Sequence, residues 1–253
     1  AVLNQLFSNR HLASFIVEFL RLIAALIISG FIATALVRIG LVNKEMVKQT
    51  YVLPVQDFFK RYGLSLAFLL LALIGLYRIS DIVLGVISNV FYQDLGYSKV
   101  EIASVVKTFG LFMTIAGGFL GGILSLRYGV LKILFLGALL SAITNLLFML
   151  LAETGYSLPM LYIVISADNL SAGLASAAFI AFLSSLTNIS FTAVQYAIFS
   201  SLMTLLPKIL GGYSGSMVES LGYQTFFLIT ALMGIPVLVL IVFAGNKLST
   251  NDK

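Results

Sequence analysis

Residues 64–92 read LSLAFLLLALIGLYRISDIVLGVISNVFY, an apolar run in which charged residues occur only within Tyr77-Arg78-Ile79-Ser80-Asp81. About 20 consecutive apolar residues cross the hydrocarbon core of a bilayer as a helix, so this run predicts a membrane span. A charge at the centre of such a helix costs about 2.5–3.5 kcal/mol, and this span carries two. Because charges at membrane depth commonly mark solute pathways, we expect Arg78 and Asp81 to lie on one.

The composition as a whole favours the same environment. Apolar residues make up 60% of the chain and charged residues 10%, and the mean hydropathy is +1.08, whereas about a quarter of a soluble domain is charged. The chain has no cysteine and a single histidine, His11, so we expect no metal site. No nucleophile with a neighbouring base is visible, and we expect neither a cofactor nor catalytic residues.

The apolar segments predict an all-α membrane protein. They fall near residues 13–40, 64–92, 101–125, 131–152, 158–185, 192–213 and 222–246. The last six predict a six-helix unit, and the first adds an N-terminal hydrophobic helix. Glu18 and Arg21 interrupt the start of that first segment, so it either crosses the membrane or lies at its interface.

These segments divide the chain into an N-terminal hydrophobic segment (1–42), a polar linker (43–62), a six-helix unit (63–247) and a tail (248–253). The turns near residues 94–101, 153 and 219 hold one cation, Lys99, whereas the opposite side carries the basic linker, Arg127, Lys132 and the tail. The positive-inside rule therefore places the linker and the C-terminus in the cytoplasm. The net charge of +5 arises largely from these loop cations, so we expect no nucleic-acid partner. The chain begins with Ala1, and we expect it to be part of a longer protein.

Ionisable residues recur at similar depths in three spans. At 1.5 Å per residue, Asp81 lies about 16 Å, Lys107 about 10 Å and Asp168 about 14 Å from the same side of the membrane. One interpretation is a buried ion network that only holds the helices together. The other is that an acid exchanges a proton while the cations bind an anionic solute. Among polar residues, the amides of Asn169 and Gln195 are our candidates for solute contact.

Small residues are concentrated where helices would meet closely, at Gly117-Gly118, Gly121-Gly122 and Ser171–Ala178. We expect most of them to serve helix packing. The second glycine pair opens the stretch GGILSLRYGVLK at residues 121–132. With Gly122, Arg127, Gly129 and Lys132, this stretch resembles the cytoplasmic signature of the major facilitator superfamily. The acid usual in that signature is missing here.

Five further stretches resemble one family within that superfamily, the muropeptide permeases (AmpG). YRISD (77–81) is similar to its Tyr-Lys-Leu-Gly-Asp, and VKTFG (106–110) to its Asn-Lys-Thr-x-Gly. DNL (168–170) with Gly173, TAVQYA (192–197) and VESLGY (218–223) resemble three more of its motifs. The resemblance runs in order from Val52 to Phe243 and covers only the C-terminal half of the family.

The resemblance implies a six-helix half of a transporter that faces an N-terminal half, in the same or a separate chain. It also implies proton-coupled import of GlcNAc-anhydroMurNAc peptides across the bacterial inner membrane for cell-wall recycling. The partners would be the lipid bilayer, protons and the glycopeptide. The implied pathway residues are Arg78, Asp81, Lys107, Asp168, Asn169 and Gln195.

Two alternatives stay open. In the first alternative, the cargo is another anion such as acetyl-CoA. Eukaryotic acetyl-CoA transporters are similar in the same motifs. Alternatively, the chain is a non-transporting remnant, or a subunit that must pair with a separate N-terminal half.

Overall fold

A computed structural model describes residues 9–251, and these residues form helices joined by short turns, with no strand in that range. Residues 1–8 of the predicted N-terminal segment and residues 252–253 of the predicted tail lie outside the described residues. Helices satisfy every backbone hydrogen bond internally, which lipid requires. Seven helical stretches of the described chain are long and apolar enough to cross a membrane. The predicted all-α membrane fold with an extra N-terminal helix is confirmed.

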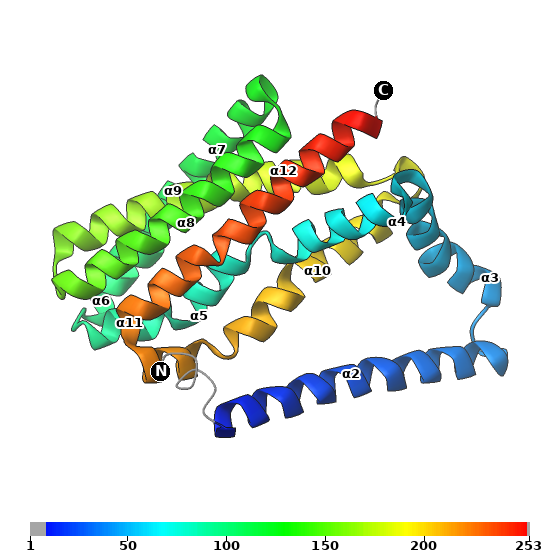
Figure 1. Cartoon of the computed structure of the whole chain (residues 1–253), viewed down its shortest axis with the longest axis horizontal. Coiled ribbons are helices and arrows are strands. Elements are labelled where there is room, and N and C mark those ends of the chain that lie inside the picture. Colours follow the sequence, from blue (N-terminus) through cyan, green and yellow to red (C-terminus); the bar gives the residue numbers. More distant parts are fainter. Residues whose placement is uncertain (1–8, 252–253) are drawn as a thin grey trace.

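One of these stretches lies in α2 (Asn9–Arg38), and Figure 1 shows this helix apart from the bundle that the other long helices form. Two short helical segments, α3 (Lys44–Val47) and the π-helical η1 (Lys48–Val52), connect α2 to the bundle. The bundle then consists of α4 (Leu53–Leu76), α5 (Ile79–Asp94), α6 (Lys99–Glu101), the π-helical η2 (Ile102–Phe109), α7 (Gly110–Tyr128), α8 (Val130–Thr154), α9 (Leu158–Leu186), the 3-10 turn η3 (Ile189–Phe191), α10 (Thr192–Gly211), α11 (Ser214–Leu232) and α12 (Gly234–Asn251).

The span predicted at residues 64–92 is broken in its middle, between α4 and α5. At this break, the side chain of Tyr77 lies between α8 and α9, where its hydroxyl donates to the carbonyl oxygen of Leu134 (3.1 Å). Its ring also stacks on Phe179, with centroids 4.3 Å apart. This buried anchor accompanies the interruption of the helix at Tyr77-Arg78.

The span predicted at residues 222–246 is also divided, because α11 ends at Leu232 and α12 starts at Gly234. In addition, α11 turns sharply at Gly222 (φ 76°, ψ 165°), and α4 does the same at Gly63 (φ 67°, ψ 167°). Glycine adopts this backbone conformation without the steric cost that a side chain imposes. Both glycines form corners at which a short leading helix passes into a span.

Helices α7 and α9 pack with their backbones close together. A Cβ atom on Gly117 would clash with the carbonyl oxygen of Leu170, and one on Gly173 would clash with that of Thr114. The predicted packing role of these small residues holds for this seam. It does not extend to Gly118, because a Cβ atom there would meet nothing within 4 Å.

The surroundings of α2 differ from those of the bundle. Its apolar side chains project outward on several sides, and Ile27, Ile28, Phe31 and Ile32 are each more than half exposed. The 20-residue stretch Phe19–Arg38 is long enough to cross a membrane. A helix that is apolar all round and stands free of the bundle is suited to lipid on all sides.

Candidate functional site

The break between α4 and α5 positions the first two charged residues. Arg78 is the residue that precedes α5, and Asp81 lies in the first turn of that helix, where the helix dipole stabilises an acid. Nε of Arg78 lies 3.1 Å from Oδ2 of Asp81. The contact is an ion pair rather than an aligned hydrogen bond, because this Nε is buried without a hydrogen-bond acceptor. Nη1 of Arg78 donates to Oγ of Ser176 on α9 (2.7 Å).

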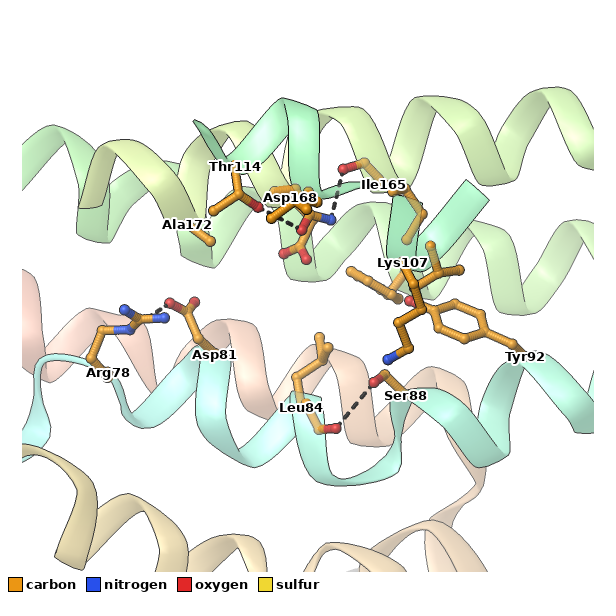
Figure 2. Close-up of a pocket in the computed structure, with 15 residues that line it drawn as sticks. Arg78, Asp81, Leu84, Ser88, Tyr92, Lys107, Thr114, Ile165, Asp168 and Ala172 are labelled. Carbon is orange, nitrogen blue, oxygen red and sulfur yellow. Dashed lines mark hydrogen bonds and ion pairs between the residues drawn. The ribbon is translucent and has the colours of Figure 1, made fainter. Parts of the chain in front are cut away.

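A cavity of about 400 Å³ lies beside this break. It brings together five of the six predicted pathway residues: Arg78, Asp81, Lys107, Asp168 and Asn169. Figure 2 shows Asp168 and Thr114 facing Arg78 and Asp81 across the cavity. We call this space the charged cavity.

Asp168 and Asn169 are neighbours on α9, but they are held differently. Nδ2 of Asn169 donates to the carbonyl oxygen of Ile165 (3.0 Å), and Oδ1 lies 2.9 Å from the hydroxyl of Thr114. Among the described residues, Asp168 accepts a single long contact, 3.4 Å, from the hydroxyl of Thr144, and that hydroxyl lies closer to the carbonyl oxygen of Ser141 (3.0 Å). The amide of Asn169 is therefore well fixed, whereas the carboxylate of Asp168 retains most of its capacity to accept hydrogen bonds.

Lys107 reaches the charged cavity from the π-helical segment η2. The wider turn is supported by the hydroxyl of Thr108, which donates to the carbonyl oxygen of Ala103, five residues earlier (3.0 Å). Figure 2 shows the amine of Lys107 extending toward Ser88 on α5. Within the described part of the chain, the Lys107 amine has neither a hydrogen bond nor an ion pair. Isolated π-helical turns occur often at functional sites.

The cavity therefore holds two acids and two cations, of which only Arg78 and Asp81 are paired. The remaining cation, Lys107, is available to an anionic group of a ligand, and the remaining acid, Asp168, is available to a proton or a hydrogen-bond donor. Among the residues that the structure describes, no group of three or more histidines and acids is arranged to hold a metal ion.

Gln195 is not brought to this cavity. It is almost fully buried (1% exposed) at the start of α10. Its Nε2 donates to the carbonyl oxygen of Pro54 (2.8 Å) and to Oδ2 of Asp57 (3.0 Å). Its Oε1 accepts from the backbone N–H of Asn188 (2.7 Å) and from Nη2 of Arg61 (3.2 Å). Both amide hydrogens and both lone pairs are thus used, and none is left for a solute.

Asp57, Arg61, Asn188 and Gln195 form what we call the Gln195 cluster. Asp57 also pairs with Arg61 (2.9 Å) and accepts from Nδ2 of Asn188 (2.9 Å). Nη2 of Arg61 also donates to the carbonyl oxygen of Leu186 (3.0 Å). The cluster joins the first turns of α4 to the turn between α9 and α10.

The residues predicted to form a cytoplasmic motif lie around the corner between α7 and α8. Gly129 makes that corner with φ 92°, and Arg127 and Lys132 are exposed on either side of it. The guanidinium of Arg127 lies over the ring of Tyr128, 5.3 Å from its centroid. Gly122 lines a shallow apolar groove on α7 together with Phe119 and Leu126. This motif shares no residue with the charged cavity.

Three hydroxyl residues around the charged cavity were not foreseen from the sequence. Thr114 holds Asn169, Thr144 contacts Asp168, and Ser176 holds Arg78. The pattern of hydroxyl residues along one helix carries no signal for Thr114 and Thr144, because each acts on a residue of another helix. Ser176 likewise acts on a residue of another segment, Arg78, so its role has no signal in the pattern of α9 either.

Comparison with protein families gives a match to the Major Facilitator Superfamily over residues 69–252. The chain belongs to this superfamily. The matched residues include the whole of the charged cavity. The predicted fold, a six-helix half of a major-facilitator-type transporter in a multi-pass membrane protein, is confirmed.

Comparison with curated proteins gives relatives that are similar to the chain over most of its length. The chain is 32% identical to "Putative transporter AmpG 4" of Rickettsia conorii, over 79% of this chain and 48% of that protein. It is 37% identical to "Putative transporter AmpG 1" of Rickettsia bellii, over 77% of this chain and 48% of the relative. An uncharacterised protein of Haemophilus influenzae is 34% identical over 81% of this chain and 50% of its own length. The predicted resemblance to half of an AmpG transporter is confirmed, and the chain spans about half the length of these relatives.

Proposed function

We propose that this chain is the C-terminal half of a proton-coupled permease that imports anhydromuropeptides across the bacterial inner membrane. One observation carries the proposal: Arg78, Asp81, Lys107, Asp168 and Asn169, from separate spans, line one cavity. Charges at membrane depth are costly, and proteins keep them mainly at solute and ion pathways. Membership of a transporter superfamily and the names of the relatives point to the same use.

The groups around the cavity suit the chemistry of a muropeptide. The peptide stem of such a molecule ends in carboxylates, which Lys107 and Arg78 are placed to bind as charge-assisted hydrogen bonds. The acetamido and hydroxyl groups of the sugars need donors and acceptors once water is removed, and Asn169 supplies both. A cavity of about 400 Å³ encloses part of such a solute, and the facing half of the transporter would enclose the rest.

We assign the exchangeable proton to Asp168. Asp81 is compensated by Arg78 at 3.1 Å, whereas the carboxylate of Asp168 has one long contact with a hydroxyl group. An uncompensated charge is costly in a low-dielectric site, and taking up a proton removes that cost. Binding of the anionic solute beside Lys107 and binding of a proton at Asp168 then load the site together.

In this proposal the six-helix unit (63–247) faces an N-terminal half, whether that half belongs to the same polypeptide or to another. The linker (43–62) and the tail (248–253) lie in the cytoplasm, together with Arg127 and Lys132, because cations accumulate on that side. The turns near Asp94 and Glu153 then face the periplasm.

The test is uptake of radiolabelled anhydromuropeptide by bacteria that lack their own permease. Cells would express this chain alone, this chain fused to or co-expressed with an N-terminal half (the joined form), or the joined form with Asp168→Asn. We expect uptake in the joined form only. No uptake in any form, with all three present in the membrane, would contradict the proposal.

The same assay addresses the alternative cargo. Excess unlabelled acetyl-CoA should not reduce uptake of the labelled muropeptide if the glycopeptide is the substrate. Accumulation of labelled acetyl-CoA by the joined form, without accumulation of muropeptide, would instead favour the acetyl-CoA alternative. If the joined form moves neither solute, the chain fits a non-transporting remnant.

A further inference from the structure

A second cavity lies at the elbow where α2 meets the linker helices. It has a volume of about 770 Å³, and its lining residues belong to α2, α3, η1 and the turn at residues 39–43. Its apolar lining consists mainly of Leu36, Val37, Val42 and Val47. We call this cavity the elbow groove, and none of its lining residues contributes to the charged cavity.

Besides Thr34, whose hydroxyl donates to the carbonyl oxygen of Phe31 in its own helix (2.8 Å), three polar side chains line the same groove: Arg38, Lys44 and Tyr51. All three are exposed, Tyr51 by 62%. In the part of the chain that the structure describes, neither Arg38 nor Lys44 has an ion pair or a side-chain hydrogen bond. The acid next to Lys44 in the chain, Glu45, does not line the groove, and its carboxylate accepts from Nε2 of Gln49 (3.4 Å). The groove therefore carries two uncompensated positive charges.

We propose that the elbow groove binds the headgroup of an anionic phospholipid. Arg38 and Lys44 supply donors for the phosphate, and the hydroxyl of Tyr51 supplies another. The acyl chains then run along the apolar surface of α2, whose exposed Phe31 and Ile32 require a hydrocarbon environment. A basic pocket beside a membrane helix, at the point where that helix meets a polar linker, is a recurrent type of lipid site.

The observations favour a lipid over a protein occupant. A protein that covered the groove would bury both cations, and burial of charges without acidic partners is costly. A lipid headgroup brings the opposite charge and stays at the water interface. An anionic lipid also suits the site better than a zwitterionic one, because the ammonium of the latter would lie near two cations. This proposal is independent of the transported solute.

The test is native mass spectrometry of the full chain, purified in detergent, stripped of lipid and titrated with phosphatidylglycerol or with phosphatidylcholine of the same acyl chains. A basic residue near an anionic headgroup contributes about 1 kcal/mol, which is about fivefold in affinity. We therefore expect phosphatidylglycerol to bind at least about tenfold more tightly than phosphatidylcholine. The double variant Arg38→Gln/Lys44→Gln should lose that preference.

The matched control is Lys60→Gln/Lys208→Gln, which removes two exposed cations that do not line the groove and should keep the preference. Equal affinity for both lipids in the unaltered chain would overturn the proposal. Equal losses in the two double variants would also overturn it, because they would indicate diffuse attraction to the net charge.

Two further experiments test for other occupants of the groove, a free anion and a protein. Inorganic phosphate that displaces the lipid at equal concentration would overturn the proposal in favour of a free-anion site. In the second experiment, a Val42→Cys variant is cross-linked to a co-expressed N-terminal half. If the cross-link forms and the complex no longer binds phosphatidylglycerol, the proposal is also overturned. The charge-preserving variant Arg38→Lys/Lys44→Arg should keep the preference, and its loss would count against a site that recognises charge. Helical content by circular dichroism verifies that each variant is folded.

Discussion

The charged cavity and the Gln195 cluster contain the same kinds of side chain, but they differ in how far those side chains find hydrogen-bond partners within the protein. Each has an acid paired with an arginine, Asp81 with Arg78 at 3.1 Å and Asp57 with Arg61 at 2.9 Å, and each has an amide side chain nearby. In the cluster, the amide of Gln195 uses all of its hydrogen-bonding capacity within the protein.

In the charged cavity, several polar groups lack hydrogen-bond or ion-pair partners among the described residues. Lys107 has no partner among the described residues, the Nε of Arg78 lacks an acceptor, and Asp168 has one long contact. Since an unsatisfied polar group at membrane depth is costly, a site that keeps several of them is prepared for a ligand or for protons. We therefore interpret the Gln195 cluster as one that holds helices together and the charged cavity as one that binds, and mutations can test this interpretation.

The largest expected effect is that of Asp168→Asn on transport. If Asp168 exchanges the proton, the variant should lose uptake by about 100-fold or more, because proton transfer by a positioned group contributes on that scale. Its unfolding temperature in detergent should not fall, because the lost contact is a single long one of 3.4 Å. Uptake at the unaltered rate would show that the cavity acid is structural, like Asp57.

Gln195→Ala should have the opposite profile. The variant removes four hydrogen bonds, two of them to the charged groups of Asp57 and Arg61. We expect the free energy of unfolding to fall by about 3 kcal/mol, while the affinity for solute is unchanged. Denaturation in detergent and equilibrium binding of labelled solute measure the two quantities. Gln56→Ala is the matched control, because Gln56 is an exposed glutamine on α4, next to the cluster residue Asp57. A loss of solute affinity in Gln195→Ala without a loss of stability would return Gln195 to the solute pathway.

Lys107→Met tests the unpaired cation. A hydrogen bond to a charged group contributes about 1.5–3 kcal/mol, so the dissociation constant for an anionic solute should rise by at least about tenfold. Stability should stay the same, because Lys107 has no side-chain partner in the described chain to lose. Lys99→Met provides the control, as Lys99 lies on the same stretch of the chain but outside the cavity. Equal affinities of the two variants would remove Lys107 from the binding site.

The smallest expected effect is that of Arg78→Lys. The charge opposite Asp81 is kept, but the Nη1 contact with Ser176 (2.7 Å) is lost, and lysine does not reproduce the planar guanidinium. We expect a decrease in uptake of about two- to fivefold, equivalent to about 0.4–1 kcal/mol. Arg78→Gln, which leaves Asp81 unpaired, should cause a much larger decrease in the same assay. Similar losses in both variants would show that geometry, rather than charge, is what the cavity requires.

The sequence was informative where position along the chain determines position in space. A span has a rise of about 1.5 Å per residue, so the count from the ends of the apolar runs predicted that Asp81, Lys107 and Asp168 lie at similar depth. These three residues do line one cavity. The six-helix bundle followed from the same apolar lengths.

The sequence was less informative where the structure depends on contacts between segments. The sequence predicts solute contact for Gln195, because an isolated amide in a span is typical of a binding group. Its partners Pro54, Asp57 and Arg61 lie more than a hundred residues away, and no periodicity reveals them. The break at Tyr77 also depends on a contact between segments, because the Tyr77 hydroxyl donates to the carbonyl oxygen of Leu134 on α8. The π-helical turn at Lys107 had no signal in the sequence.

The seam between α7 and α9 limits how the transporter can move. Because Gly117 and Gly173 lie directly against the opposite backbone, sliding one helix past the other would force main chain into main chain. We therefore expect the two helices to move as a single rigid body that carries Asp168 and Asn169 together. Arg78 and Asp81 lie at the start of a different helix across the cavity, and the contact of Arg78 with Ser176 on α9 is made by side chains. An opening or closing step that preserves the seam thus changes the spacing between the two walls of the cavity while each wall keeps its own geometry.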